Sequence, residues 1–407
     1  MSFNFFPCRL SPGIAFNLVV FCVTLWLLPI PSAQAQTFTV LHTFHGRPDG
    51  VSPSASPILD SSGNLYGTTS FGGRHFNGTA FKVTPGGKET VLYSFVGVYG
   101  EWPGTPLLRD EQGTLYGTTG AGGVHRDGTV FRLNGKGNER VLFNFSNRTG
   151  GGPNSLIRDA EGNLYGTLET DGCYSCGAVF KLTPVGKMHV LYTFTGGQDG
   201  GSPTGNLVRD SAGNLYGTTW YGGDMNCAEG QGCGTVFKLD PAGHETVLHA
   251  FAGSPNDGEG PRGGWLDKNG TFYGATSLGG SGSACELGCG MVYKLDPDGT
   301  ETVLYDFTGE GGDGDYPVGG VTLDDVGNVY GATLDGRGGQ NPGAIFLVDP
   351  TGKETILHTF TGSPDGAGPN GVTLDGKGNI FGTTEAGGDP NCGGPYYGCG
   401  TVFKLIP

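Results

Sequence analysis

The 407-residue chain carries 81 glycines and a formal net charge of −15, and 15% of its residues are charged. This acidity argues against nucleic acid or an anionic membrane surface as a partner, because both would repel the protein. Abundant glycine is typical of disordered chains, but here the glycines recur at fixed offsets within a repeat of about 50 residues, which indicates one repetitive domain.

The first 35 residues differ from the rest of the chain. Arg9 precedes an apolar run over residues 16–30, and Ala33-Gln34-Ala35 offers the small residues at which a signal peptidase cuts. The pattern predicts a secretory signal peptide over residues 1–35 and no membrane span after its removal. We therefore expect a secreted or periplasmic protein, with an uncleaved N-terminal anchor as the alternative.

Each repeat contains four short strand candidates. The first ends in an Asp that is followed three residues later by Gly, as in Asp60 and Gly63, which predicts a type I turn. The second is the Asn-Leu-Tyr-Gly-Thr-Thr run, over residues 64–69 in the first copy. After a variable Gly-rich loop comes a Gly-Thr-Val-Phe-Lys-Leu-like run, and a turn such as Asp240-Pro241-Ala242-Gly243 leads into a Glu-Thr-Val-Leu-Tyr-x-Phe-like run. The last two strands are expected to form a hairpin.

Four antiparallel strands repeated seven times predict an all-β fold, a seven-bladed β-propeller with four-stranded antiparallel blades. The last copy stops after its third strand, at residues 401–406, and its missing fourth strand stands at residues 39–44. We expect the N-terminal strand to pair with the C-terminal strand and close the ring, although an open β-solenoid is the alternative. The expected domain is 36–407, with blades at 53–95, 103–145, 153–194, 203–251, 261–307, 317–360, and 369–407 plus 37–44.

The repeat unit resembles a known family. Asp-x-x-Gly-Asn-Leu-Tyr-Gly-Thr-Thr, then Gly-Gly, then Gly-Thr-Val-Phe-Lys-Leu is similar to the GloVer tandem repeats of exported bacterial proteins, over residues 38–407. Such relatives often carry one of several C-terminal surface anchors, hence the description "choice-of-anchor". This sequence shows no sorting tail after its last repeat, so a freely secreted or periplasmic form is expected. The resemblance implies an exported propeller and brings no activity or catalytic residues.

The tight turns are expected on one face of the ring, and the long loops after the second strand lie on the other face with the linkers between repeats. A binding site is expected on this second, more variable face. Its aromatic residues could stack on sugar rings or fill spaces between blades: Trp102, Trp220, Tyr221, Tyr174, Tyr316, Tyr396 and Tyr397. His75 and His125 lie in the first two loops and are further ligand-binding candidates.

Eight cysteines fall in these loops. In an oxidising compartment they are expected to pair within each loop, as Cys173–Cys176, Cys227–Cys233, Cys285–Cys289 and Cys392–Cys399. A redox or zinc Cys-x-x-Cys is the alternative for the first pair.

An Asp-Gly pair recurs in the linkers between repeats, at Asp49, Asp199, Asp257, Asp313 and Asp365. These carboxylates could bind calcium, the one cofactor that the sequence suggests. Each site offers one or two acids where calcium takes about six or more oxygens. A turn in which the Asp bonds its own backbone is therefore the favoured interpretation.

The sequence contains no Gly-x-Ser-x-Gly, phosphate-loop or His-Glu-x-x-His motif. We expect an exported monomer without catalytic activity that binds a glycan or protein ligand through its loop face. The alternative is a secreted polysaccharide hydrolase or lyase, with catalytic acids contributed by several blades.

Overall fold

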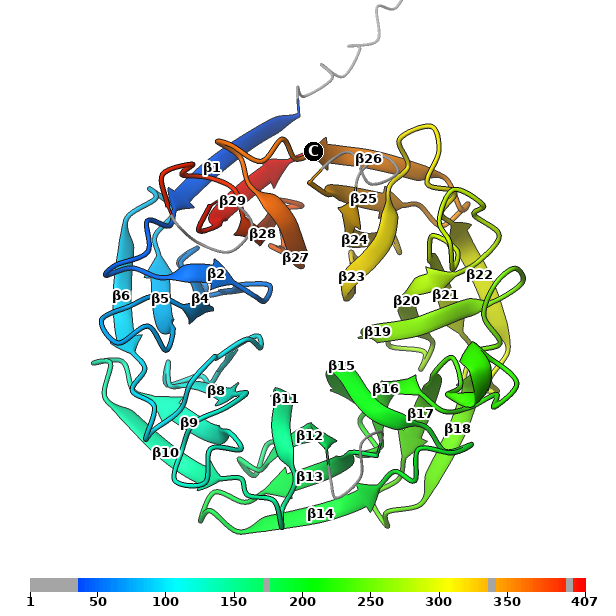
Figure 1. Ribbon diagram of the computed structural model, residues 1–407, viewed down its shortest axis with the longest axis horizontal. Coiled ribbons are helices and arrows are strands. Elements are labelled where there is room, and N and C mark those ends of the chain that lie inside the picture. The colour runs from blue at the N-terminus through cyan, green and yellow to red at the C-terminus, as the bar shows by residue number, and fades with distance from the viewer. Residues whose placement is uncertain (1–35, 171–175, 336–341, 393–397) are drawn as a thin grey trace, which may run out of the picture. The chain divides into compact units, whose positions relative to one another are not determined.

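The computed structural model describes residues 36–407 except 171–175, 336–341 and 393–397. These residues form seven antiparallel sheets arranged around a ring, so the predicted seven-bladed propeller is confirmed (Figure 1). Four predicted residues, Cys173, Tyr174, Tyr396 and Tyr397, lie outside the described ranges. One short helix, η1 (Ala228–Gly230), occurs in the described residues, and none of them forms a helix long and apolar enough to cross a membrane.

The innermost strand of each blade lines the central axis (Figure 1). These strands are β2 (Val51–Pro53) with β3 (Ile58–Leu59), β7 (Leu108–Arg109), β11 (Gly151–Arg158), β15 (Gly201–Arg209), β19 (Gly258–Leu266), β23 (Asp315–Leu323) and β27 (Ala367–Leu374). Pro57 and Pro106 follow the channel-lining segments of the first two blades, where proline has no N–H to donate to a neighbouring strand. The inner strand is therefore split in the first blade and shortened in the second.

The two middle strands of each blade form its core. The second strands are β4 (Leu65–Phe71), β8 (Leu115–Thr119), β12 (Leu164–Thr170), β16 (Leu215–Tyr221), β20 (Phe272–Gly279), β24 (Val329–Asp335) and β28 (Ile380–Ala386). The third strands are β5 (Thr79–Val83), β9 (Thr129–Leu133), β13 (Ala178–Leu182), β17 (Thr235–Leu239), β21 (Met291–Leu295), β25 (Ala344–Val348) and β29 (Thr401–Ile406). A Cβ on Gly382 would lie 2.3 Å from the ring of Phe403, so glycine in the repeated Tyr-Gly-Thr run makes room for the buried aromatic ring.

The outermost strands follow one another around the perimeter (Figure 1). They are β6 (Glu89–Ser94), β10 (Glu139–Asn144), β14 (Met188–Thr193), β18 (Glu245–Ala250), β22 (Glu301–Asp306), β26 (Glu354–Thr359) and β1 (Thr37–Thr43). Strand β1 pairs antiparallel with β29, from Thr37 opposite Ile406 to Thr43 opposite Thr401. The predicted pairing of the two terminal strands is therefore present, and one blade is built from both ends of the chain.

The recurring Asp fixes the turn between the first and second strands. Asp60 accepts hydrogen bonds from the backbone N–H of Asn64 at 2.9 Å and from the hydroxyl of Tyr66 at 3.1 Å. Gly63 closes the turn with φ of 79°, a region that glycine enters without strain. The Asn and Tyr of the repeated run are thus partners of the turn carboxylate and not a ligand site.

Neighbouring blades meet at the perimeter through a repeated side-chain pair. The first residue of an outer strand lies against an aromatic ring near the end of the preceding outer strand. At five junctions that ring is polar and the residue is Glu: Glu301 Oε2, for example, lies 3.8 Å from His249 Nε2. Where the ring is Phe143 the residue is Met188, and both pack on one apolar cluster. At the junction with the N-terminal strand, Phe38 stacks on His358 with ring centroids 3.7 Å apart.

Candidate functional site

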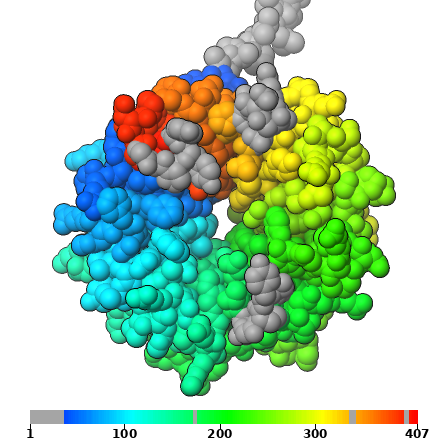
Figure 2. Space-filling view, viewed as in Figure 1, coloured from blue at the N-terminus to red at the C-terminus, as the bar shows by residue number. Residues whose placement is uncertain are grey.

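The inner strands converge on a cavity of about 340 Å³ at the axis, where the space-filling view shows the ring hollowed (Figure 2). The residue after the recurring proline of each inner strand lines this cavity or the one beside it. These residues are Ser54, Gly104, Asn154, Thr204, Arg262, Val318 and Asn370. Arg262 is the charged member of this set, so the fifth blade breaks the symmetry of the channel.

A second cavity of about 370 Å³ adjoins the first and shares Asn154, Gly205 and Arg262 with it. Trp220 and Tyr221, at the end of β16, line this second cavity together with Glu169 from the end of β12. Two of the predicted aromatic residues are therefore brought to the mouth of the channel. We call the residues lining these two cavities the channel site.

Trp220 of the neighbouring blade and Ser277 of the same blade hold Arg262 in place. Its guanidinium carbon lies 4.2 Å from the ring centroid of Trp220, and its Nε donates a 2.8 Å hydrogen bond to Ser277 Oγ. Gly260 makes this arrangement possible, because a Cβ at its φ of 63° would lie 2.7 Å from the Trp220 ring. Burial lowers the pKa of Arg262, because removal from water disfavours the charged form of the guanidinium.

Arg262 was not among the site residues predicted from the sequence. The signal that could have found it is its place directly after the recurring Pro261, where the other six blades carry small, polar or aliphatic residues. Its aromatic partner gives no local signal, since Trp220 lies 42 positions earlier.

Of the other predicted aromatic residues, the two that the structure describes, Trp102 and Tyr316, do not line the channel site. Trp102 is 50% exposed and meets the 38% exposed Phe71 edge to face, with ring centroids 6.3 Å apart. Tyr316 packs on the apolar cluster around the Cys285–Cys289 disulfide. His75 and His125 are exposed in separate loops, and His75 lines a shallow cavity with Tyr93.

The residue before the recurring proline adopts positive φ in every blade. The seven residues are Ser52, Trp102, Gly152, Ser202, Gly260, Tyr316 and Gly368. Trp102, at φ of 58°, therefore occupies a conformation that costs a bulky residue about 1–2 kcal/mol.

Trp102→Gly is expected to stabilise the protein by about 0.5–1 kcal/mol, because relief of this strain outweighs the entropy that glycine loses on folding. Denaturant unfolding measures the change. Trp265 is the matched control: it is 44% exposed but lies in extended β19. Trp265→Gly is expected to destabilise by about 1 kcal/mol. Loss of stability in Trp102→Gly would contradict the strain.

Three of the predicted disulfides lie in the described loops, namely Cys227–Cys233, Cys285–Cys289 and Cys392–Cys399, with Cα atoms 5.6, 5.3 and 5.7 Å apart. Cys176 is also disulfide-bonded. The carbonyl of the second cysteine accepts a hydrogen bond from the next blade: Gly260 N–H donates to Cys233 and Tyr316 N–H to Cys289, both at 3.0 Å. Each disulfide thus anchors the loop that holds the neighbouring inner strand.

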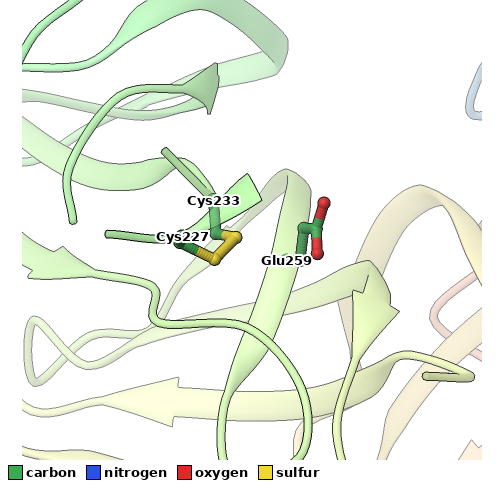
Figure 3. Close-up of side chains that lie close together, drawn as sticks. All are labelled: Cys227, Cys233 and Glu259. Atoms are coloured by element: carbon green, nitrogen blue, oxygen red, sulfur yellow. A yellow bond between two sulfur atoms is a disulfide. The ribbon is translucent and has the colours of Figure 1, made fainter. Parts of the chain in front are cut away.

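Glu259 lies beside the Cys227–Cys233 disulfide (Figure 3). The two cysteines and the glutamate could bind a metal only if both sulfurs were thiolates. Here the two sulfurs are joined in a disulfide. The carboxylate is partly buried, which raises its pKa.

The linker Asp residues bond their own loops and the outer-strand rings. Asp257 accepts hydrogen bonds from the N–H groups of Ala252 and Gly258 and lies 3.1 Å from His249 Nε2. Asp365 meets His358 and Asp313 meets Tyr305 in the same way, each at 3.1 Å. The group of His249, Asp257 and Glu301 has the donors of a metal site, but Tyr305 replaces its histidine in the next blade. Calcium binding by the linker Asp residues stays a prediction.

Comparison with solved structures supports the fold. The extracellular domain of a B. thetaiotaomicron protein described as a hybrid two-component system, BT3049, superposes over 91% of this chain with a TM-score of 0.56 and 15% identity. This chain spans 41% of that domain's length. A Bacteroides uniformis protein described as a 6-phosphogluconolactonase superposes over 82% of this chain and 89% of its own, with a TM-score of 0.51 and 17% identity. At such identities the likeness shows the fold alone.

The family comparison agrees with the repeats. No curated protein matches the sequence. The model of the Gloeobacter/Verrucomicrobia repeat matches residues 30–230 and again residues 226–407, so it covers every blade and confirms the GloVer resemblance. The chain belongs to the Gloeobacter/Verrucomicrobia repeat family.

Proposed function

We propose that this protein is an exported, non-catalytic propeller that binds a saccharide at the channel site. The observation that carries the proposal is the asymmetry of the channel mouth. Blades with small or neutral residues surround two adjoining cavities, and one junction supplies Trp220, Tyr221 and Arg262.

The chemistry of the channel site suits sugars. Aromatic rings supply flat apolar surface, and Asn154, Thr204 and Glu169 supply donors and acceptors for hydroxyl groups. Asn154 is already oriented by a 2.8 Å hydrogen bond from its side-chain N–H to the carbonyl of Pro203. Such convergence of a few polar groups on a partly apolar concave surface is typical of small-molecule sites.

The lining supports binding over hydrolysis. Hydrolysis of glycosides commonly uses two carboxyl groups about 5–10 Å apart. Among the described residues that line the channel site, Glu169 is the one carboxylate. The His–Asp pairs, such as His249 with Asp257, belong to the outer strands and their linkers.

Export is supported by the disulfides and by the apolar run near the N-terminus. Disulfides persist in oxidising compartments and are rare in the cytosol. We propose cleavage after residue 35 and a secreted or periplasmic mature protein.

A glycan array probed with residues 36–407, followed by calorimetry on the saccharides that bind, tests the function. Trp220→Ala is expected to weaken binding about 10-fold or more, because it removes the stacking surface and frees Arg262. Trp265→Ala, which removes an exposed tryptophan outside the channel site, should leave affinity unchanged. Unchanged affinity in Trp220→Ala, or release of shortened sugars from the bound glycan, would contradict the proposal.

A further inference from the structure

We infer that the ligand of the channel site is an anionic saccharide, and that Arg262 binds its carboxylate or sulfate group. The inference rests on the proposed function and makes it more specific. It assigns a specificity-determining role to one residue of the fifth blade.

The guanidinium has unused donors. Its Nε bonds Ser277 Oγ, and no carboxylate within the described part of the chain pairs with it, since each ion pair found there involves a histidine. The Nη atoms donate to no group in the described residues, and Arg262 lines both cavities. Four N–H donors therefore remain for a ligand.

A partly buried, unneutralised cation loses part of its hydration, which is costly unless something pairs with it. The protein itself has abundant acid, with 38 Asp and Glu residues against 23 Lys and Arg, yet none of those described is placed against this guanidinium. An anionic ligand would supply the missing charge. The planar fork of arginine matches carboxylate and sulfate oxygens in pairs.

The surroundings prepare Arg262 for this task. Trp220 and Ser277 fix its plane before any ligand arrives, so little side-chain entropy is lost on binding. Tyr221 lies in the same cavity, where a sugar ring that carries the anion can contact it. Glu169, which lines the same cavity, would accept hydrogen bonds from hydroxyl groups and repel a second anion. The site thus fits a saccharide with one acidic group next to neutral hydroxyls.

The test compares oligogalacturonate and oligoglucuronate with their carboxyl-reduced, neutral counterparts, and adds a sulfated oligosaccharide to identify the anion. Calorimetry is run on the wild type, on Arg262→Gln and on Arg262→Lys. The matched control is Arg209→Gln, which removes the same charge from an exposed arginine near the Tyr165 ring, 5.9 Å from its centroid and outside the channel site. Thermal melting shows whether each variant folds, and Arg262→Lys provides a second variant that keeps the charge.

The wild type is expected to bind a uronate or sulfated saccharide about 10- to 100-fold more tightly than its neutral counterpart. Arg262→Gln should remove this preference while the neutral sugar still binds, Arg262→Lys should keep part of it, and Arg209→Gln should keep all of it. Equal affinity of the wild type for acidic and neutral sugars, or a preference that survives in Arg262→Gln, overturns the inference and leaves the proposed function intact. Failure to bind any saccharide overturns both.

Discussion

Deletion of residues 37–44 is expected to abolish the cooperative unfolding transition of this protein. These residues include β1, the outer strand of the last blade, and Phe44, which is fully buried in a cluster that also contains Phe81 of the first blade and Val402 of β29. Their removal exposes the edge of β29 and separates the last blade from the first. Burial of an apolar side chain contributes about 2 kcal/mol, so loss of several approaches the whole stability of an ordinary domain.

Circular dichroism melting and size-exclusion chromatography measure this effect. A chain that begins at Gln36 is the control, because residues 36–407 form a compact unit. We expect the control to melt in one sharp transition and the deletion variant to aggregate or melt broadly. A synthetic peptide of residues 37–44 should partly restore the transition, and a deletion variant that melts like the control would disprove closure by β1.

The protein is expected to be more stable at pH 5.5 than at pH 8.5. Five glutamates begin outer strands, and burial raises the pKa of each to about 7. They are Glu89, Glu139, Glu245, Glu301 and Glu354, and one carboxyl oxygen of each is buried without a hydrogen-bond partner in the described residues. The folded protein therefore holds these protons more tightly than the unfolded chain, and the associated stability is lost as pH rises through 7.

The size of this effect follows from the partial burial of the glutamates. Because solvent screens them, each contributes about 1 kcal/mol, far less than the full shift would give. Together they should raise the melting temperature by about 5 °C at the lower pH. The turn carboxylates act in the opposite sense: burial raises the pKa of Asp60, but hydrogen bonds from Asn64 and Tyr66 outweigh it and lower the pKa. That contribution is lost as pH falls below the ordinary value of 3.8.

Substitution of the five glutamates by glutamine tests the assignment. Glutamine keeps the shape and removes the titration, so the fivefold variant should melt at nearly the same temperature at pH 5.5 and pH 8.5. Glu111→Gln, at an exposed turn, is the control and should keep the wild-type dependence. A fivefold variant that still loses stability between these pH values would assign the effect to other groups.

The repeat made most of the fold predictable, because the same patterns of strand and turn residues recur along the chain at constant spacing. Patterns that arise by chance do not recur in this way. The closure by β1 followed from the same repetition, since the last copy lacked the strand that the N-terminus supplied. The split first inner strand and the short second one were not predicted. They depend on Pro57 and Pro106, which do not belong to the repeated pattern.

The channel site was only partly predictable. Trp220 and Tyr221 stood out as aromatic residues after a strand, yet Trp102 and Tyr316 stood out equally and lie elsewhere. What selects among them is the direction of each side chain at a blade junction, which depends on residues such as Gly260 in the next repeat. Departures from the repeat, of which Arg262 is the clearest, were a better guide to the site than residue type.

The side-chain pairs between neighbouring outer strands also determine the order in which blades can follow one another. Glu301 follows a blade that ends in His249, whereas Met188 follows a blade that carries Phe143. If the second and fourth blades exchanged places, Glu301 would face the phenyl ring of Phe143 and Met188 would face His249. The first exchange buries a carboxylate against hydrocarbon, and the second leaves an imidazole beside a thioether. Although the seven repeats look alike in sequence, any recombination that separates Phe143 from Met188 would produce a ring with mismatched joints.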